Sequence, residues 1–396
     1  MNLDTPELRA FRQEVRDFFA RELPEDIRGK VAEDRMDLPK EDQRRWHNIL
    51  VKKGWAVPSW PVEWGGPGWD DARQYIYERE YALADAPRHM SYGINLLGKS
   101  MMKFGTEAQK KKFLTRICNG DDFWCQGFSE PNAGSDLASL QCKAVREGDH
   151  YIVNGSKMWT SEGHIADWIF CLVRTDSSGK KQFGITFLLI DMKSPGVELQ
   201  PTWTYDGGGR EVNQTFFTDV RVPVENRMGD ENQGWNIVKY LLGIERFGTA
   251  EVSRSLAMLA RLKRFAAGAR HRGARLIDDP AFSRKTAEAE IELRAVELTE
   301  LRLLFGGSPA GAEASLLKLR GTEVQGRILE LLYEAVGSHA QVRVGDLEAT
   351  TGVPAGPSQA RHAGAAYFNF RKTLIYAGSN EIQRNIIAKA VLGLRG

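Results

Sequence analysis

Cysteine is scarce in this chain, and its spacing carries no signature of a metal or redox site. The four cysteines, Cys118, Cys125, Cys142 and Cys171, form no C-x-x-C pair, and the seven histidines form no H-E-x-x-H motif. Zinc sites and redox dithiols therefore have no support. A chain of 396 residues buries roughly three quarters of its unfolded surface and needs no disulfide framework. We expect a protein of the reducing cytoplasm without bound metal.

Neither charge of one sign nor a long apolar run stands out in this sequence. Lys and Arg number 54 against 52 for Asp and Glu, a formal net charge of +2. Such a balance is typical of an ordinary protein surface and disfavours nucleic acid as the main partner. No apolar stretch approaches the roughly 20 residues of a membrane span. The opening sequence MNLDTPELRA places acidic residues before any apolar run, so we expect no signal peptide.

The common phosphate-binding and nucleophile motifs are missing as well. No G-x-G-x-x-G follows a predicted strand, and neither G-x-x-x-x-G-K-[ST] nor G-x-S-x-G occurs. A Rossmann fold, a P-loop and a serine nucleophile therefore lack support. The glycine triplet at 207–209 precedes Arg210 between two predicted strands, and this position favours a flexible turn.

Helical periodicity marks the chain up to about residue 120. Thr5 followed by Pro6 predicts a helix start, and apolar residues then recur at three- and four-residue steps until Pro24. Thr106-Glu107-Ala108-Gln109 predicts a capping box that opens another helix. Further helices are predicted at 39–53, 72–83 and 94–104. The segment PSWPVEWGGPGW at 58–69 predicts an ordered loop with aromatic anchors.

Short β-rich runs from about residue 121 predict a small barrel or sandwich. Asn154-Gly155, which suits a type I′ turn, predicts a hairpin between strands at 151–153 and 156–160. Clusters of Gly, Pro, Asp and Ser bound further predicted strands at 168–174, 184–191 and 215–222.

From Gly234 onward the periodicity is helical again. Long helices are predicted near 235–268, 281–305, 312–336 and 361–393, the last interrupted at Gly378. Four long helices favour an antiparallel bundle. About 150 residues per domain would give two or three domains, and the pattern places them at 1–120, 121–232 and 233–396. The predicted fold class is therefore α+β multi-domain, with a helical N-terminal domain, a middle β-barrel and a C-terminal four-helix bundle.

Three segments carry the residues best suited to a binding site. They are FSEPNAGSDL at 128–137, YIVNGSKMWTSEG at 151–163 and YAGSNEIQR at 376–384. The first is a loop whose amides, with Ser129 and Ser135, either bind the polar edge of a ligand or simply connect two elements. Along the second, Trp159 and Ser161 alternate and are expected to share one face with Lys157. A core position is the alternative for the tryptophan.

These segments correspond to the patterns [ST]-E-P-x-A-G-S-D, N-G-x-K-x-W-[IT]-[ST] and Y-x-G-[ST]-x-x-I-Q-R. Through them, in that order, the chain resembles the acyl-CoA dehydrogenase family along nearly its whole length. The family's order of helical domain, β-barrel and four-helix domain matches the three regions predicted above. The N-terminal half, including KKGWAVPSWPVEWGG, is most similar to the large subunit of pimeloyl-CoA dehydrogenases and other bacterial enzymes that pair with a smaller homologous subunit.

The resemblance implies bound FAD, held without a Rossmann fold between barrel and bundle. It implies that the backbone amides of Phe128 and Ser129 face the pyrimidine edge of the flavin. It places Gly134 and Ser135 along the cofactor and along the pantetheine of the substrate. Asn132 stands where this loop often has glycine, and asparagine tolerates left-handed backbone geometry.

The other two segments carry further implied cofactor contacts. Trp159 would cover the ring face away from the substrate, and Ser161 would hydrogen-bond near N5. Ser379 and Glu381 match positions that touch the cofactor across the bundle. The family's Arg-x-x-Phe-Gly, which reaches the FAD pyrophosphate of a neighbouring subunit, is not found in ARHRGARLIDDP. Three arginines there either substitute for it or form a solvated basic helix end: Arg270, Arg272 and Arg275.

Removing a proton α to a thioester carbonyl requires a carboxylate base shielded from water. Many family members carry this base directly after the tyrosine of Y-x-G-[ST], where the present chain has Ala377. Other branches, including those that resemble isovaleryl-CoA dehydrogenase, carry it in an E-R pair on the first bundle helix. Glu245-Arg246 occupies that place.

The sequence around Glu245 also favours a buried base over a solvated helix carboxylate. No ion-pair partner stands three or four residues away, where the chain has Leu241, Leu242, Gly248 and Thr249. Such an apolar helix face raises the pKa of a carboxylate. Ala377 retains a backbone N–H that is expected to bind the thioester oxygen.

The implied activity is FAD-dependent dehydrogenation of an acyl-CoA thioester to the trans-2-enoyl form, in fatty or dicarboxylic acid degradation. Electrons would pass to an electron-transfer flavoprotein. An oxidase of the same fold that uses oxygen directly is one alternative, and a flavin-poor structural subunit of a heteromer is another. The missing Arg-x-x-Phe-Gly favours an α2β2 heterotetramer with a homologous small subunit over a homotetramer.

Overall fold

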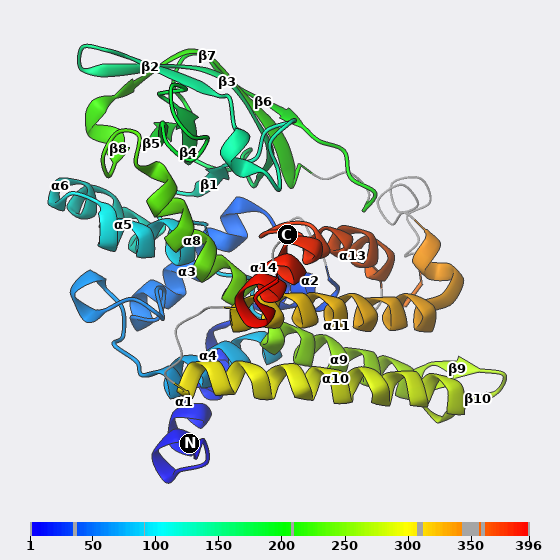
Figure 1. The fold of residues 1–396 in the computed structure, drawn as a ribbon. Coiled ribbons are helices and arrows are strands. Elements are labelled where there is room, and N and C mark those ends of the chain that lie inside the picture. Colours follow the sequence, from blue (N-terminus) through cyan, green and yellow to red (C-terminus); the bar gives the residue numbers. More distant parts are fainter. Residues whose placement is uncertain are drawn as a thin grey trace.

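A computed structural model describes residues 2–34, 38–90, 92–206, 210–306, 312–342, 356–357 and 361–394. The predicted glycine turn at 207–209 lies outside these residues. In Figure 1 a β-sheet forms one end of the molecule, with N-terminal helices beside it and a group of long C-terminal helices beneath it. This arrangement of helical, sheet-rich and helical parts confirms the predicted fold class.

The N-terminal part is built from helices, and several of their ends are those the sequence indicates, although α2 was not predicted. Thr5 accepts a hydrogen bond from the Leu8 amide at the start of the first helix, and Gly54, at φ 77°, ends the third. The helices are α1 (Pro6–Glu22), α2 (Glu25–Ala32), α3 (Lys40–Lys53), α4 (Asp71–Leu83), α5 (Lys99–Phe104), α6 (Glu107–Gln109) and α7 (Thr115–Asn119). The capping box of Thr106 and Gln109 is present.

Two π-helical turns interrupt this region, at Tyr92–Gly98 and Lys110–Leu114. The sequence predicted an ordinary helix over 94–104, so the first of these turns corrects that prediction. The loop at 58–69 is ordered as predicted, because Trp60 is buried and its Nε1 donates to the Ile94 carbonyl over 2.9 Å. This contact holds the turn that carries Tyr92 against the loop.

The middle part is an eight-stranded sheet. Its strands are β1 (Trp124–Gly127), β2 (Lys143–Glu147), β3 (His150–Ser161), β4 (Trp168–Arg174), β5 (Ile185–Asp191), β6 (Val197–Pro201), β7 (Val212–Pro223) and β8 (Arg227–Met228). Neighbouring strands follow the order β6-β7-β3-β2-β4-β5-β8, and β1 pairs in parallel with β4. Phe128, Phe170 and Phe187 pack in the core that joins this sheet to the helices.

The predicted hairpin at Asn154-Gly155 is wrong, because β3 continues through it as one strand. Asn154 lies opposite Asp219 of β7 and exchanges two hydrogen bonds of 2.9 Å with it. Gly155 serves close packing rather than a turn, since a Cβ there would lie 2.8 Å from the Cα of Cys142. The tight turn is instead at Gly148, between β2 and β3.

The C-terminal part contains the long helices. They are α8 (Gly234–Thr249), α9 (Val252–Gly268), α10 (Pro280–Phe305), α11 (Ala312–Val336), α13 (Ala363–Asn369) and α14 (Asn380–Leu392). A short hairpin, β9 (Arg270–His271) and β10 (Ala274–Arg275), joins α9 to α10. The predicted helix over 235–268 is two helices, because Glu251 adopts φ 44° between them. Gly378, at φ 78°, interrupts the last segment as predicted.

Helix α11 lies at the centre of the bundle. It packs against α8, α9, α10, α13 and α14, and Figure 1 shows it between α14 on one side and α9 and α10 on the other. Short 3-10 helices connect the longer elements, at Val62–Trp64, Leu137–Ser139, Val224–Asn226, Leu276–Asp278, Gly337–Gln341 and Phe370–Leu374.

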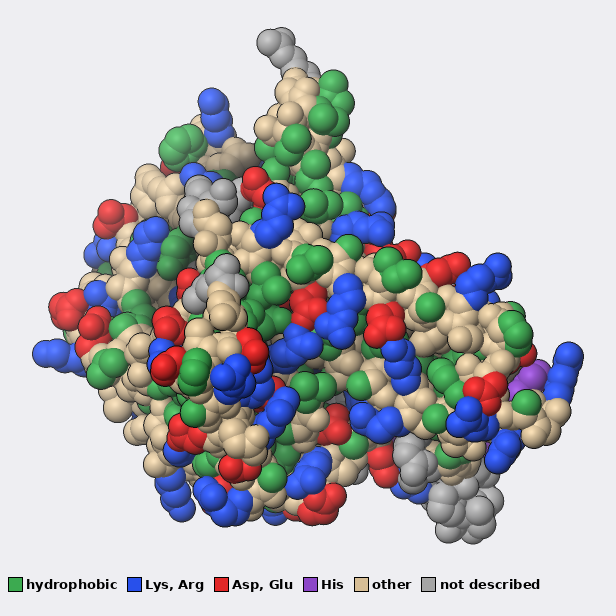
Figure 2. Space-filling view, turned by 90° about the horizontal axis from the view of Figure 1, so that it is seen from below, with side chains coloured by type: hydrophobic (Ala, Val, Ile, Leu, Met, Phe, Trp, Pro, Cys, Tyr) green, Lys and Arg blue, Asp and Glu red, His purple; other side chains and the backbone are tan. Residues whose placement is uncertain are grey.

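The surface shows no single dominant charge on the face drawn in Figure 2, where basic and acidic side chains are interspersed. Among the described residues, no helix is both long and apolar enough to cross a bilayer.

Candidate active site

The loop after β1 offers backbone donors to a ligand. Within the described part of the chain, the amides of Ser129, Gly134 and Ser135 donate to no backbone carbonyl. Gly134 and Ser135 are exposed, whereas the Phe128 side chain is buried against Phe170. The loop is thus anchored in the core at one end and carries free N–H groups at its exposed end.

A buried ion pair joins this loop to β3. The ammonium of Lys157 donates to Glu130 Oε1 over 2.7 Å and to the Phe128 carbonyl over 3.2 Å. The Glu130 carboxylate also accepts from the amides of Gln141 and Cys142, over 2.7 and 2.9 Å. Both residues stand in the quoted motifs, but the sequence did not indicate that they pair.

Trp159 projects from a distorted part of β3. Its side chain is 56% exposed and its backbone adopts φ 62°, a conformation rare for bulky residues and common at functional sites. The core alternative for this tryptophan is therefore wrong. An exposed indole held in strained backbone suits contact with a flat ligand.

The expectation that Lys157, Trp159 and Ser161 share one face is also wrong for Lys157. Between Lys157 and Thr160 the strand advances three residues while β7 advances two, from Thr215 to Asn213. This β-bulge reverses the alternation. Lys157 and Thr160 therefore both point into the protein, fully buried, while Trp159 points outward.

Tyr92, from the π-helical turn, hydrogen-bonds to the Ser161 side chain and lies within the electrostatic influence of Glu245. Burial raises the pKa of Tyr92, the carboxylates of Glu162 and Glu245 raise it further, and a hydrogen bond with the Ser161 side chain opposes them. Residues from β3 and from α8 thus influence one phenol of the N-terminal part. No signal in the sequence pointed to Tyr92, which lies outside every motif.

Glu245 is half-buried on α8, and its Oε2 is shielded from solvent. The hydroxyl of Thr249 donates to the Glu245 backbone carbonyl over 2.6 Å. The charge of Glu245 acts on Tyr92, Tyr376 and Lys318. The surroundings are therefore more polar than the apolar helix face that the sequence predicted. The side chain of Arg246 lies outside the described part of the structure.

The last segment carries Tyr376, on which Glu245 also acts, and Ala377 directly after it. Burial, and then the charge of Glu251, raise the pKa of Tyr376, with a further contribution from Glu245. Ala377 has φ 54°, and its carbonyl accepts from Gln383 Nε2 over 3.0 Å. Gln383, from the following helix α14, thus helps to hold the turn that carries Ala377.

Ser379 and Glu381 lie at the start of α14. The Ser379 hydroxyl caps the helix by accepting from the Ile382 amide over 3.4 Å. Backbone amides and the Ser379 side chain hold the pKa of Glu381 below its ordinary value. Both side chains thus contribute to the N-terminus of the helix.

A second group of charges adjoins Ser161. Burial raises the pKa of Glu162 to about 7, Glu211 adds to this, and Arg88 and Lys372 oppose it. Arg88 donates to Glu251 Oε2 over 2.6 Å, and Lys372 pairs with Glu211. This group ties the end of β3 to the N-terminal part and to the segment before α14.

The three arginines of the predicted FAD-pyrophosphate contact lie on the β9–β10 hairpin. This hairpin is at the end of α9 remote from α8 (Figure 1). Arg270, Arg272 and Arg275 are exposed, and Arg275 donates to Asp278 over 2.6 and 2.9 Å. The hairpin therefore lies apart from the Glu245 region of its own chain.

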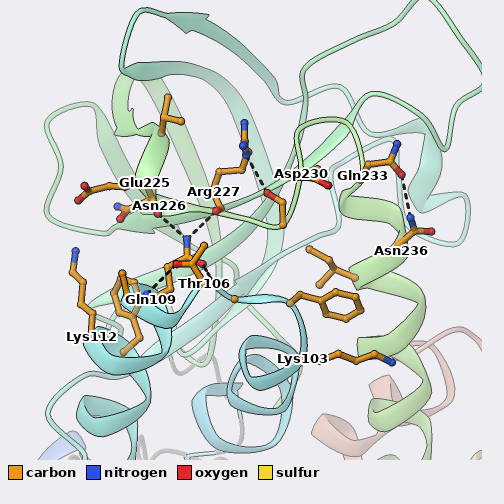
Figure 3. Close-up of a pocket in the computed structure, with 17 residues that line it drawn as sticks. Lys103, Thr106, Gln109, Lys112, Glu225, Asn226, Arg227, Asp230, Gln233 and Asn236 are labelled. Carbon is orange, nitrogen blue, oxygen red and sulfur yellow. Dashed lines mark hydrogen bonds between the residues drawn. The ribbon is translucent and has the colours of Figure 1, made fainter.

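A pocket of about 970 Å³ lies at a different place, between α5, α6 and the start of α8 (Figure 3). Gln109 projects from α6 and donates to the carbonyls of Glu225 and Arg227 over 2.7 and 2.8 Å. The last residue of α8 that lines the pocket is Ile237. It lies eight residues, or about 12 Å, along the helix from Glu245. This pocket is therefore separate from the described surroundings of Glu245.

A sheet at one end of the molecule and two helical parts packed against it define the class of protein. Three family models match the chain in order: acyl-CoA dehydrogenase N-terminal domain at 5–121, middle domain at 125–220 and C-terminal domain at 232–392. The chain belongs to the acyl-CoA dehydrogenase family and is an enzyme of that type.

Similar proteins match this chain over nearly its full length. Acyl-CoA dehydrogenase IpdE1 of Mycobacterium tuberculosis is 33% identical over 97% of both chains. The crystal structure of the ChsE4-ChsE5 complex from Mycobacterium tuberculosis matches with a TM-score of 0.85 and 33% identity, covering 100% of both chains. The Tcur3481-Tcur3483 steroid ACAD matches with a TM-score of 0.86 and 31% identity, again covering 100% of both chains.

Proposed function

We propose that this protein catalyses FAD-dependent α,β-dehydrogenation of an acyl-CoA thioester to the trans-2-enoyl form and passes electrons to an electron-transfer flavoprotein. One observation carries the proposal. The Ser161 side chain hydrogen-bonds to Tyr92, the charge of Glu245 of α8 raises the pKa of the same phenol, and Glu245 also acts on Tyr376, directly before Ala377. This supports a single site that would join the implied flavin contact, the base and the thioester-oxygen donor.

The residues present suit a flavin. Trp159 offers an exposed planar surface, and the loop offers unbonded amides at Ser129, Gly134 and Ser135 for a polar ring edge. These residues, with Phe128 and Ser161, would hold the ring system. When bound, the flavin supplies the acceptor for the hydride that leaves the β carbon.

The remaining chemistry belongs to the chain's own groups. Glu245 would take the proton from the α carbon, and the shielding of its Oε2 keeps water from competing for that proton. Tyr92 and Tyr376 stay protonated near neutral pH, since burial raises the pKa of each. The Ala377 amide would donate to the thioester oxygen, where negative charge develops.

The test is the Glu245→Gln variant. It keeps the size of the side chain but removes the base, so turnover should fall by about 10²–10⁴-fold while absorbance of bound flavin persists. Glu288→Gln, which alters an exposed carboxylate paired with Arg327, is the matched control. Unchanged turnover in Glu245→Gln would remove Glu245 as the base.

The acyl group is identified by bleaching of the yellow protein with a panel of acyl-CoA thioesters. The panel contains straight-chain, branched, dicarboxylic and steroid-bearing acyl groups. The steroid-bearing thioesters are included because the similar Tcur3481-Tcur3483 protein is a steroid ACAD. The thioester that bleaches the flavin fastest defines the substrate class.

The alternatives make different predictions. An oxidase would transfer electrons from the reduced protein to oxygen at the rate of turnover, whereas a dehydrogenase would require the flavoprotein acceptor. A flavin-poor structural subunit would need neither the shielded Glu245 nor the exposed Trp159.

We also propose assembly with a homologous second chain as an α2β2 heterotetramer. Two similar structures each combine two named components, the ChsE4-ChsE5 complex and the Tcur3481-Tcur3483 enzyme. The exposed apolar residues Ile291 and Leu298 lie seven positions apart on α10 and so share one face. Such a face supports association with another subunit.

A further inference from the structure

Lys318 is a fully buried lysine in the middle of the bundle. Its ammonium donates to Asn380 Oδ1 over 2.8 Å. The hydroxyl of Thr322, one turn later on α11, donates to the same oxygen over 3.3 Å. A buried ammonium is costly unless it is hydrogen-bonded and faces negative charge, so this arrangement requires a reason.

Asn380 connects Lys318 to the proposed thioester site. It is the first residue of α14 and directly follows Ser379, the cap of that helix. The turn that precedes the cap contains Ala377 and Gly378, both with positive φ. A bond from α11 to Asn380 therefore holds the end of the turn whose amide is proposed to bind the thioester oxygen.

The same face of α11 also fixes the end of the helix that carries Glu245. A Cβ at Gly321 would lie 2.8 Å from the Cα of Ala250, so only glycine lets the helices approach so closely. Gln325 Nε2 donates to Glu251 Oε2 over 3.1 Å at the junction of α8 and α9. Lys318, Gly321 and Gln325 are spaced by three and four residues and so share one side of the helix.

The charges around Lys318 come from two elements. Burial lowers the pKa of Lys318 to about 8, while Glu381 of α14 and Glu245 of α8 act against this. Lys318 is thus mostly protonated at pH 7. Three described groups respond to the charge of Glu245: Tyr92 from the π-helical turn, Tyr376 from the segment before α14 and Lys318 from α11. Among these three, only Lys318 carries a positive charge.

We infer that Lys318 is a positioning residue of the site: through Asn380 it fixes the Ala377 turn, and its ammonium favours the carboxylate form of Glu245. The inference rests on the proposed function. A nearby positive charge stabilises a carboxylate, so its removal makes the base harder to deprotonate. The acidic limb of the pH profile should then move to higher pH.

The experiment measures exchange of the α-proton of an acyl-CoA with deuterated water by NMR, using the holoenzyme across pH. This readout reports proton removal without requiring turnover. Lys318→Met keeps an unbranched apolar stem but removes the charge, and the midpoint of the acidic limb should rise by about 1 pH unit. Lys318→Arg keeps the charge and should restore the wild-type midpoint. Lys285→Met, which removes an exposed lysine paired with Glu334, is the control.

The outcomes separate the inference from the proposed function. If wild type exchanges the proton and Glu245→Gln does not, but Lys318→Met leaves the midpoint unchanged, Lys318 is only structural and the inference is overturned. If wild type and Glu245→Gln exchange equally, the proposed base is wrong. Should Lys318→Met not fold, Lys318→Gln retains a donor for Asn380 and is judged by the same midpoint.

Discussion

Glu130 and Lys157 form a buried ion pair between two motif segments, with 2.7 Å from Glu130 Oε1 to the ammonium of Lys157. The lysine is fully buried, and the glutamate nearly so. The pair ties the ligand-facing loop to the strand that carries Trp159. Two backbone amides also donate hydrogen bonds to the Glu130 carboxylate. The buried charges are therefore well compensated.

Breaking this pair from one side should destabilise the protein strongly. Lys157→Met leaves the Glu130 carboxylate buried without its cation, at a cost of about 3–5 kcal/mol. Lys157→Met with Glu130→Gln should cost less than the sum of the single changes. Urea unfolding measures both. Lys181→Met, whose pair with Asp136 is 65% and 60% exposed, should cost about 0–1 kcal/mol. Additive effects of the two core changes would show that the pair is not coupled.

Trp159 and Ser161 should affect the flavin differently. Trp159→Ala removes the exposed planar surface and should weaken flavin retention in gel filtration and shift the flavin absorption spectrum. Ser161→Ala removes a donor and should leave a yellow protein that substrate reduces more slowly, by stopped-flow absorbance. Trp203, exposed on the loop after β6, provides the matched Trp203→Ala control. If both site variants behave like this control, the flavin lies elsewhere.

Glu162 should make stability depend on pH. Burial raises its pKa from 4.5 to about 7, so the folded protein holds this proton more tightly than the unfolded chain does. The contribution of Glu162 to the free energy of unfolding is therefore fully present below pH 4.5, and it is lost as the pH rises through about 7. Glu162→Gln abolishes that loss, so its melting temperature relative to wild type should increase from about pH 5 to about pH 8. Glu334→Gln, an exposed site, should show a flat difference, and a flat difference for Glu162→Gln would contradict the raised pKa.

The number of FAD molecules bound per chain should depend on whether a homologous second chain is present. Expressed alone, the chain should hold less than one FAD per chain or aggregate, because a homologous partner would complete the cofactor site. Co-expression with a homologous second chain should restore flavin, measured as the ratio of flavin to protein absorbance with mass from light scattering. A stable homotetramer with one FAD per chain would instead assign the pyrophosphate contact to Arg270, Arg272 or Arg275 of a second copy.

The sequence by itself determined the elements whose signals are local. The Thr5 cap, the capping box at Thr106 and the helix end at Gly54 depend on side chains within a few residues, and the structure confirms each. The switches of periodicity near 121 and 234 separate the helical and sheet parts for the same reason. Motif order was sufficient to indicate the family.

Tertiary structure alone decided how the site is assembled. Asn154-Gly155 looks like a turn locally, yet pairing with β7 keeps it extended, and the bulge before Thr160 reverses which side chains are buried. A lysine at 318 between Leu317 and Leu319 was the available clue to a buried cation. Its partner Asn380 is 62 residues away, as Glu130 is 27 residues from Lys157. Such pairs form only when packing brings distant segments together, because the free energy that selects them comes from burial and not from local backbone preference.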